Sequence, residues 1–342
     1  MKQCVGGNRC LNELLRECLN SDRLSLTMTE KKPEKDHQPV LLNEVIHYFE
    51  PCKLRLLVDG TTGAGGHAAA LLQAHPEIER FIAIDQDPLA LKIAAEVLSP
   101  WKDKITFIPG NFENLDQYLD QLGISKIDGM LLDLGVSSMQ LDISEKGFSF
   151  LRDGPLDMRM DPENPITAAI IVNTYSQKEL ERIFREYGEE KQWKSAARRI
   201  LQARNEGPIL TTHQLVEVLR PVLRVKPGKW INPCTLIFQA LRISVNRELE
   251  VIEKGVPKAI QRLNSGGRLG VISFHSLEDR IVKNLFRDAA SDKWETQGLA
   301  GLFRDKEPEV ILLTRKPAIG TSSEVASNAR SRSAKLRFIE KK

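Results

Sequence analysis

A glycine-rich turn after a short apolar run carries the first residues that could do chemistry. The run Leu56–Asp59 leads directly into a turn that holds Gly65, Gly66 and His67. Glycine tolerates positive φ and lets a ligand approach the backbone closely. A strand, such a turn and a helix together predict a cofactor site, and the alternative is a tight connection that binds nothing. His67, at the expected helix start, would either bond toward the cofactor or pack in the core.

Acidic side chains end the neighbouring apolar runs, and they favour one kind of cofactor. Asp85 ends the second run, a position from which a carboxylate accepts hydrogen bonds from both hydroxyls of a ribose. NAD and S-adenosylmethionine both contain this ribose, but Asp59 at the end of the first run would meet the ammonium of the methyl donor. Phe112 would pack on the adenine, and Asp133 ends the fourth run. The alternatives are a helix N-cap role for Asp85 before Pro88 and a core position for Phe112.

Short apolar runs alternate with helix-length stretches from residue 40 to about residue 140, which is typical of βαβ units and a parallel sheet. The predicted strands are Leu54–Asp59, Arg80–Asp85, Ile105–Pro109, Ile127–Asp133, Arg268–Ser273, Val310–Thr314 and Leu336–Ile339. Helices are predicted at Ala68–Ala74 and Leu89–Leu98. From about residue 140 to residue 245 the pattern is mostly helical. Because ligands bind at the carboxyl ends of the strands in open α/β sheets, a helical insertion would lie beside that edge.

These elements predict an α/β fold with a Rossmann-like core, a mainly parallel sheet and an inserted helical domain. Residues 37–142 and 246–342 would form the cofactor-binding domain, and residues 143–245 the helical insertion. Residues 1–36 are polar and show no period, which predicts a disordered extension.

The composition indicates a globular protein and excludes several classes. Hydrophobic residues make up 41% and charged residues 28% of the 342 residues, values that argue against disordered and fibrous proteins. No run approaches the roughly 18 apolar residues of a membrane span, and the N-terminus lacks the apolar segment of a secretory signal. We therefore expect a cytoplasmic protein. The five cysteines fit neither a disulfide framework nor a zinc site, so we expect reduced thiols and no metal.

Seven motifs, taken in order, resemble a single family. They are His37–Leu42, Gly63–His67, Asp85–Pro88, Asp133–Asp142, Gly147–Phe150, Asp153–Met160 and Ile272–Arg280. The chain resembles, from about residue 37 to residue 340, the ribosomal RNA small-subunit methyltransferase H family, also called the MraW family, which methylates cytosine N4 in 16S rRNA. The resemblance implies a class I S-adenosylmethionine-dependent methyltransferase fold with S-adenosylmethionine as cofactor. It also implies a substrate, the decoding-centre cytosine at position 1402 of 16S rRNA.

The resemblance also implies the cofactor contacts. They would be Gly65, Gly66, His67, Asp85, Phe112, Asp133 and Gln140. Asp59 is our addition from its position at the end of the first run. One segment departs from the family, which typically has His-Pro-Ala-Thr-Arg-Thr-Phe-Gln where this chain has Asn232–Gln239. If the missing histidine or arginine contacts RNA in the family, the affinity or rate of this protein would differ.

Methylation of cytosine N4 depends on positioning, because the lone pair of the amine is conjugated into the ring. Many amino-methyltransferases place an Asp/Asn-Pro-Pro-aromatic motif after the fourth strand, and this chain has Asp133 followed by a different loop. Candidate acceptors for the amine are the Asp133 carboxylate, the loop carbonyls and the hydroxyls of Ser137 and Ser138. We assign Asp133 mainly to the cofactor and name it also as a candidate catalytic residue.

His275 is the second candidate catalytic residue. It follows the apolar run Leu269–Phe274 and should open onto the same edge of the sheet as the cofactor. There it could accept a proton or contact the edge of the base. In the alternative, Ser276 caps a helix, Asp279 closes a capping box and His275 only packs.

Basic residues in the helical region could contact RNA phosphates, and the alternative is a solvated helix face. They are Lys191, Lys194, Arg198, Arg199 and Arg204. Arg159, between Asp157 and Asp161, would grip a phosphate or form local salt bridges. From residue 315 to the end, eight basic residues stand against two acidic ones. That segment would contact phosphate or form a mobile terminus.

The expected partner is 16S rRNA in the small ribosomal subunit, and a homodimer is left open. Other functions also stay open at this point. One is a methyltransferase of the same fold that acts on another nucleic acid or a small molecule. Another is a ribosome assembly factor that binds S-adenosylmethionine without turnover, and a third is an NAD-dependent oxidoreductase. Methyl transfer to RNA separates the first two from our expectation, and failure to bind nicotinamide cofactors excludes the third.

Overall fold

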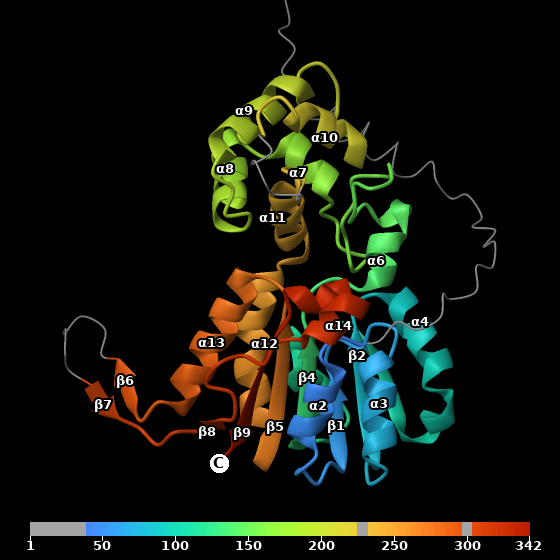
Figure 1. Ribbon diagram of the computed structural model, residues 1–342, viewed down its shortest axis with the longest axis vertical. Helices are drawn as coiled ribbons and strands as arrows, with labels where there is room; N and C mark the ends of the chain where they lie inside the picture. The colour runs from blue at the N-terminus through green and yellow to red at the C-terminus, as the bar shows by residue number, and fades with distance from the viewer. Residues whose placement is uncertain (1–38, 224–231, 296–302) are drawn as a thin grey trace, which may run out of the picture. The chain divides into compact units, whose positions relative to one another are not determined.

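The computed structural model describes residues 39–223, 232–295 and 303–342. The chain divides into two units, residues 1–37 and 38–342, and every described residue belongs to the second. The predicted N-terminal extension lies outside the described residues. The second unit contains a seven-stranded sheet with the strand order β3-β2-β1-β4-β5-β9-β8 (Figure 1). The strands are β1 (Leu56–Asp59), β2 (Arg80–Asp85), β3 (Ile105–Pro109), β4 (Ile127–Asp133), β5 (Leu263–Ser273), β8 (Val310–Leu312) and β9 (Lys335–Lys341).

Strands β1 to β5 run parallel to one another, and β9 is antiparallel to both β5 and β8. The sequence-based prediction of a mainly parallel Rossmann-like sheet is therefore confirmed. The predicted strand Leu336–Ile339 is confirmed as part of β9, and the alternative of a mobile C-terminus is wrong because Lys335–Lys341 lies inside the sheet. Its Arg337 pairs with Asp279 at 2.7 Å, which further fixes the strand. A small antiparallel pair, β6 (Lys293–Glu295) with β7 (Phe303–Asp305), was not predicted.

Helices cover both faces of the sheet because its strands alternate two sets of apolar side chains. One face, with Leu57 and Phe81, packs against α2 (Leu42–Phe49), α3 (Gly66–Ala74) and α4 (Pro88–Val97). The other face, with Val58 and Ile82, packs against α5 (Leu115–Gln121), α12 (Glu248–Arg262) and α13 (Ser276–Ala290). Because the strands are buried on both faces, each is a nearly continuous apolar run in the sequence. Such runs allowed the strands to be predicted.

A third hydrophobic core lies in the helical region. It is built from α7 (Ala168–Thr174), α8 (Gln177–Glu186), α9 (Trp193–Arg204), α10 (Thr212–Leu219) and α11 (Thr235–Asn246). Fully buried side chains such as Phe184, Ile200 and Leu241 fill it. The separate core supports a proposal that residues 143–245 form an insertion domain. Between this region and β4 lie α6 (Ser138–Asp142) and the short turn η3 (Ser144–Lys146).

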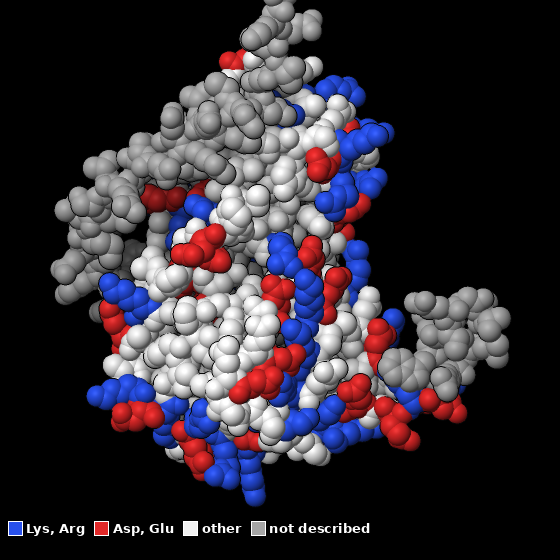
Figure 2. All heavy atoms as spheres, turned by 180° about the vertical axis from the view of Figure 1, so that it is seen from behind, with Lys and Arg blue, Asp and Glu red and all other residues white. Residues whose placement is uncertain are grey.

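Charged side chains of both signs are interleaved on the molecular face shown in Figure 2. That face carries no continuous field of one sign, in keeping with the net charge of +3. Contacts with a polyanion would therefore depend on local groups of residues rather than on a general field. Within the described residues, no helix has both the length and the apolar character needed to cross a membrane.

Asn246 ties the end of α11 to the loop before α7, and its loss is expected to destabilise the fold. Its Oδ1 accepts the Met160 N–H at 2.9 Å, and its Nδ2 donates to the carbonyls of Met158 and Arg242 at 2.8 and 2.9 Å. Asn246→Ala leaves buried backbone groups unpaired and should lower the free energy of unfolding by about 1–3 kcal/mol. Urea denaturation measures this loss. The exposed Asn205→Ala is the control, and equal effects for both variants would contradict the assignment.

Candidate cofactor and substrate site

Three carboxylates meet at one edge of the sheet. Asp59, Asp85 and Asp133 end β1, β2 and β4, which are adjacent in the order β2-β1-β4. The strands are parallel, with Asp59 paired to Ala83 on one side and Leu131 on the other. Their carboxyl ends therefore lie together, as the sequence predicted for the cofactor edge.

Asp85 holds the glycine-rich turn rather than capping a helix. Its Oδ2 accepts the Gly63 N–H at 2.7 Å, and its Oδ1 accepts the Asp87 N–H at 2.9 Å. The N-cap of α4 is Asp87, whose side chain accepts the Leu89 N–H. The alternative that Asp85 is the helix cap is therefore wrong. Each Asp85 oxygen keeps a second lone pair, which can accept a ribose hydroxyl.

Gly65, Gly66 and His67 form the start of α3, where the chain turns sharply. Gly65 is the N-cap and has a left-handed φ of 86°, which favours glycine. A Cβ on Gly66 would lie 2.9 Å from the Pro39 side chain, so this glycine allows close packing of the segment before α2. The sequence pattern identified these glycines as important, and the structure shows why glycine is needed at each position.

His67 connects Asp133 to the segment before α2. Its Nε2 is 2.9 Å from the carbonyl of Val40, which can only accept, so Nε2 carries a proton. Its Nδ1 lies 3.6 Å from Asp133 Oδ2. Attraction across that gap needs a second proton, on Nδ1 or on Asp133. His67 is buried and thus bonds within the protein, toward a residue of the predicted cofactor site.

The electrostatics of the three carboxylates fit a cationic cofactor. Burial, with the charges of Asp133 and Asp85, raises the pKa of Asp59 to about 8. Burial raises the pKa of Asp85 to about 6 and also raises that of Asp133. The buried Asp133 Oδ1 has no hydrogen-bond partner among the described residues. Backbone N–H groups hydrogen-bond to Asp59 and Asp85, but burial outweighs these bonds in its effect on both pKa values. S-adenosylmethionine would bring an ammonium, a sulfonium and ribose hydroxyls to this edge. A Cβ on Gly63 would meet the Thr61 carbonyl oxygen at 4.0 Å, an ordinary contact distance.

The raised pKa of Asp59 predicts a pH-dependent stability. An aspartate in the unfolded chain has a pKa of about 4, so between about pH 4 and 8 the folded protein binds a proton that the unfolded chain releases. Stability should therefore fall as pH rises through this window, by on the order of 1 kcal/mol per pH unit. Asp59→Asn removes the titration of this group and should reduce the slope, leaving the contributions of Asp85 and Asp133. Urea midpoints at several pH values test this, and parallel curves for the two proteins would count against it.

Gln140 belongs to a polar network beside the three acids. Its Oε1 accepts the Ser137 N–H at 3.1 Å and its Nε2 donates to Asp87 Oδ2 at 3.1 Å. Asp87 also pairs with Lys146. Gln140 thus joins the loop after β4 to the loop after β2, so it positions both. A direct contact between Gln140 and the cofactor stays a prediction.

Phe112 begins the short turn η2 (Phe112–Asn114) after β3, and it lies in the core. Its side chain is buried among the cluster that includes Val58 and Met130. Its ring faces α12, where a Cβ on Gly255 would lie 2.4 Å from it. This contact supports the alternative that Phe112 is a core residue, at least on that side of its ring. Stacking of Phe112 on the adenine stays a prediction.

Two polar residues near this edge were not singled out from the sequence. Gln86 follows Asp85, and its Oε1 accepts from Asn111 Nδ2 at 3.1 Å while its Nε2 lies 3.0 Å from Met160 Sδ. Gln86 therefore links β2 to the turn after β3 and to the insertion. Gln86 directly follows Asp85, the candidate for ribose binding, and this position could have identified it from the sequence.

His275 is the N-cap of α13. Its Nδ1 accepts the Glu278 N–H at 3.4 Å, and Glu278 Oε2 accepts the N–H groups of His275 and Phe274. This is a capping box, but the predicted pair of Ser276 and Asp279 is wrong by one residue, because the helix begins at Ser276. Asp279 pairs instead with the strand β9.

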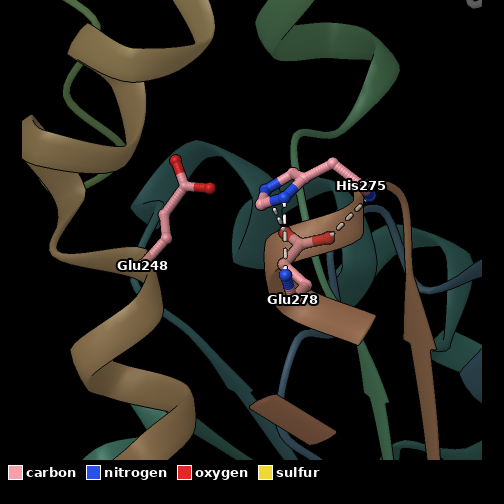
Figure 3. Close-up of side chains that lie close together, drawn as sticks. All are labelled: Glu248, His275 and Glu278. Carbon is pink, nitrogen blue, oxygen red and sulfur yellow. Dashed lines mark hydrogen bonds and ion pairs between the residues drawn. The ribbon is translucent and has the colours of Figure 1, made fainter. Parts of the chain in front are cut away.

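The imidazole of His275 lies beside the carboxylate of Glu278 (Figure 3). Its Nε2 is 3.1 Å from Glu278 Oε1, and this nitrogen is buried. Burial alone would raise the pKa of Glu278, but the hydrogen bond with His275 and the charge of Arg242 hold that pKa below its usual value. Both ring nitrogens thus face Glu278, which supports a structural role. A catalytic role for His275 stays a prediction.

Glu248 approaches the same pair from α12 (Figure 3). Single ligand atoms of Glu248, His275 and Glu278 lie within 4.8 Å of one another, a spacing that could hold a metal ion. Both Glu248 oxygens, however, accept hydrogen bonds from the Arg242 guanidinium at 2.8 Å. The guanidinium is the cation that Glu248 binds, so we assign no metal here. The sequence reasoning named His275 but missed Glu248, which comes from the separate helix α12.

Several predicted RNA contacts serve the fold instead. Arg159 forms a bidentate pair with Asp157 and donates to the carbonyl of Pro162, which is the local network left open above. Arg204 donates to the carbonyls of Val172 and Tyr175 at the end of α7. Three basic side chains of the helical region are exposed and stay candidates for phosphate contact: Lys191, Lys194 and Arg198.

Comparison with known proteins gives consistent matches over most of the chain. The model of the MraW methylase family matches residues 34–342. The ribosomal RNA small subunit methyltransferase H of Protochlamydia amoebophila is 59% identical over 310 residues, which cover 90% of this chain and 98% of that protein. The protein of the same name from Pelobacter propionicus is 46% identical over 309 residues, covering 89% and 98%. A solved structure of a putative rRNA methylase from Clostridium thermocellum has a TM-score of 0.41 and 13% identity, covering 90% of this chain and 100% of that one.

Proposed function

Since this chain belongs to the MraW methylase family and is an S-adenosylmethionine-dependent methyltransferase, we propose that its substrate is small-subunit ribosomal RNA. We further propose that the methyl group goes to N4 of the decoding-centre cytosine at position 1402 of 16S rRNA, in the cytoplasm. The relatives named for small-subunit rRNA methylation support the first statement. The motifs quoted from the sequence support the second.

One observation carries the proposal: three carboxylates lie at adjacent strand ends, with Asp59 buried, Asp85 and Asp133 partly buried, and Asp133 Oδ1 without a hydrogen-bond partner among the described residues. In the bound state, S-adenosylmethionine supplies an electrophilic methyl group on its sulfonium. Asp85 would accept hydrogen bonds from the ribose hydroxyls, and Asp59 would accept hydrogen bonds from the ammonium. Asp133, with one oxygen held near His67, would face the reacting end. This division gives each acid a different part of one ligand.

The residues around Asp133 also determine what happens to the target amine. Cytosine N4 needs an acceptor that orients it toward the methyl group, and it must lose a proton after transfer. The unpartnered Oδ1 of Asp133 can accept a hydrogen bond from the amine. Ser137 is less suited, because its hydroxyl accepts the Gln140 N–H as part of a helix cap. We therefore assign positioning of the amine to Asp133 and the loop carbonyls.

The helical region between residues 143 and 245 would recognise the RNA around the target. A base in folded rRNA must leave its stack to reach a buried methyl group, so the enzyme needs a surface that holds the surrounding strand. The exposed cations of α9 support this use of the insertion. The segment 232–239, which departs from the family pattern, leads into α11 of the same region.

The test is methyl transfer from labelled S-adenosylmethionine to a set of acceptors. Small-subunit particles that lack the modification are compared with large-subunit particles, duplex DNA and free cytidine. We expect label in the small-subunit rRNA alone. Label in DNA or in a free nucleoside would move the assignment to another substrate, and cofactor binding without any transfer would indicate an assembly factor.

A further inference from the structure

A cavity of about 340 Å³ lies between the turn after β5 and the C-terminal segment that holds α14 (Ser322–Ser327) and η4 (Ala329–Arg332). Phe274 and His275 form one wall, and Ile319, Arg332 and Lys335 are on the others. Its volume is within the range of small-ligand sites. None of the cofactor contacts assigned above lines it.

The cavity adjoins the loop where the target base would be held. Phe274 packs against Gly135, where a Cβ would lie 3.1 Å from the ring. Arg330 lies over the same ring at 5.2 Å and donates to the carbonyl of Val136 at 2.6 Å. Gly135 and Val136 follow Asp133 in the chain, so Phe274 separates the cavity from the loop that carries the candidate amine acceptor.

The charge around the cavity is positive. Asp279 is shared by Lys335 at 3.2 Å and Arg337 at 2.7 Å, so two cations face one acid. Arg332 is exposed and has no charged partner within the described part of the chain. The nearby acid Glu324 is held by neutral donors, since its Oε1 accepts the Leu41 N–H and the Ser331 hydroxyl. Its charge therefore remains, and the three cations Arg332, Lys335 and Arg337 stand against the two acids Asp279 and Glu324. The excess positive charge suits a phosphate.

An apolar side chain stands beside these cations. Ile319 is 64% exposed, which is unusual for a large aliphatic residue at the edge of a cavity. Together with Val325 it offers an apolar surface on which the flat face of a base can pack. A free anion would be bound by the cations alone and would not need the apolar side chains. Apolar surface and positive charge together fit a nucleotide, which has both a base and a phosphate.

We propose that this cavity binds the nucleotide next to the target cytosine. Arg332 would contact its phosphate and Ile319 its base, while Phe274 keeps it apart from the reacting base. The proposal rests on the proposed RNA substrate and adds a second site that holds the strand on one side of the target. A strand held there would fix the position of the target amine before transfer.

The test measures binding of fluorescein-labelled RNA, spanning the target cytosine, to the full-length protein without cofactor. Arg332→Gln should weaken binding about 5-fold and reduce the slope of log affinity against log salt by roughly 0.7, the value for one phosphate contact on a single strand. Ile319→Ala should weaken binding about 5-fold with the slope unchanged, because less apolar surface is buried against the base. Arg287→Gln, an exposed arginine on α13 outside the cavity, is the matched control and should change neither.

RNA that lacks the base on the 5′ or the 3′ side of the target separates stacking from general damage. One of the two abasic RNAs should bind wild-type protein about 5-fold more weakly, and Ile319→Ala should cause no further loss with it. The proposal is overturned if both cavity variants bind like Arg287→Gln. Failure of the proposed function is a different result, since the wild-type protein would then transfer no methyl group to small-subunit particles.

Discussion

Replacing Asp85 with alanine should weaken S-adenosylmethionine binding at least 100-fold. The carboxylate would accept two ribose hydroxyls, and hydrogen bonds to a charged group contribute about 1.5–3 kcal/mol each. Their loss corresponds to two powers of ten or more in affinity. Asp85 also holds the Gly63 N–H, so the turn itself would loosen. Isothermal titration calorimetry measures the loss directly.

Further variants separate the effect of the Asp85 charge from the effect of its shape. Asp85→Asn keeps one oxygen for the Gly63 or Asp87 N–H, and it should fall between wild type and Asp85→Ala. Asp103→Ala removes an exposed acid just before β3 begins, at the amino end of that parallel strand rather than at the carboxyl ends, and it should bind as wild type does. An Asp85→Ala protein with unchanged affinity would show that the cofactor does not use this carboxylate.

Replacing Arg242 with methionine should cost about 3–5 kcal/mol in the free energy of unfolding. Its guanidinium is the partner of Glu248, and both side chains are mostly buried, 16% and 9% exposed. Without it, Glu248 and the nearby Glu278 would remain buried with less positive charge around them. Urea denaturation followed by circular dichroism measures the change.

Arg55 provides a matched control for this prediction. It forms the same two-hydrogen-bond pair with Glu79, but those side chains are 70% and 60% exposed. Arg55→Met should change stability little, because water replaces the lost partner. The double variant Arg242→Met with Glu248→Leu should recover much of the loss. If Arg242→Met and Arg55→Met had equal effects, the buried pair would not have the role assigned to it.

The sequence predicted the parallel strands of the sheet well because strands buried on both faces leave continuous apolar runs. β2, β3 and β4 have the predicted bounds, and the acids Asp85 and Asp133 end two of them. The position of the C-terminal strand was harder, since pairing of β9 with both β5 and β8 depends on contacts between distant segments. The strand Leu336–Ile339 itself was predicted, and the alternative of a solvated end, which the basic residues suggested, is wrong because Arg337 is buried against Asp279.

Side-chain partnerships were the least predictable part of the site. The capping box of His275 and Glu278 differs by one residue from the one expected, and a shift of one position exchanges which groups are buried. The hydrogen bond from Gln140 to Asp87 joins the loops after two different strands, so no local sequence pattern predicts it. Arg242, Glu248 and Glu278 come together only when α11, α12 and α13 pack.

The central claim is that this methyltransferase modifies one cytosine of small-subunit rRNA. The most direct measurement is nucleoside mass spectrometry of unmodified small-subunit particles after reaction with wild-type protein and S-adenosylmethionine, followed by mapping of the modified fragment. The account predicts N4-methylcytidine at a single site, absent with Asp85→Ala. A methyl group on another nucleoside, or no transfer by a protein that binds the cofactor, would contradict it.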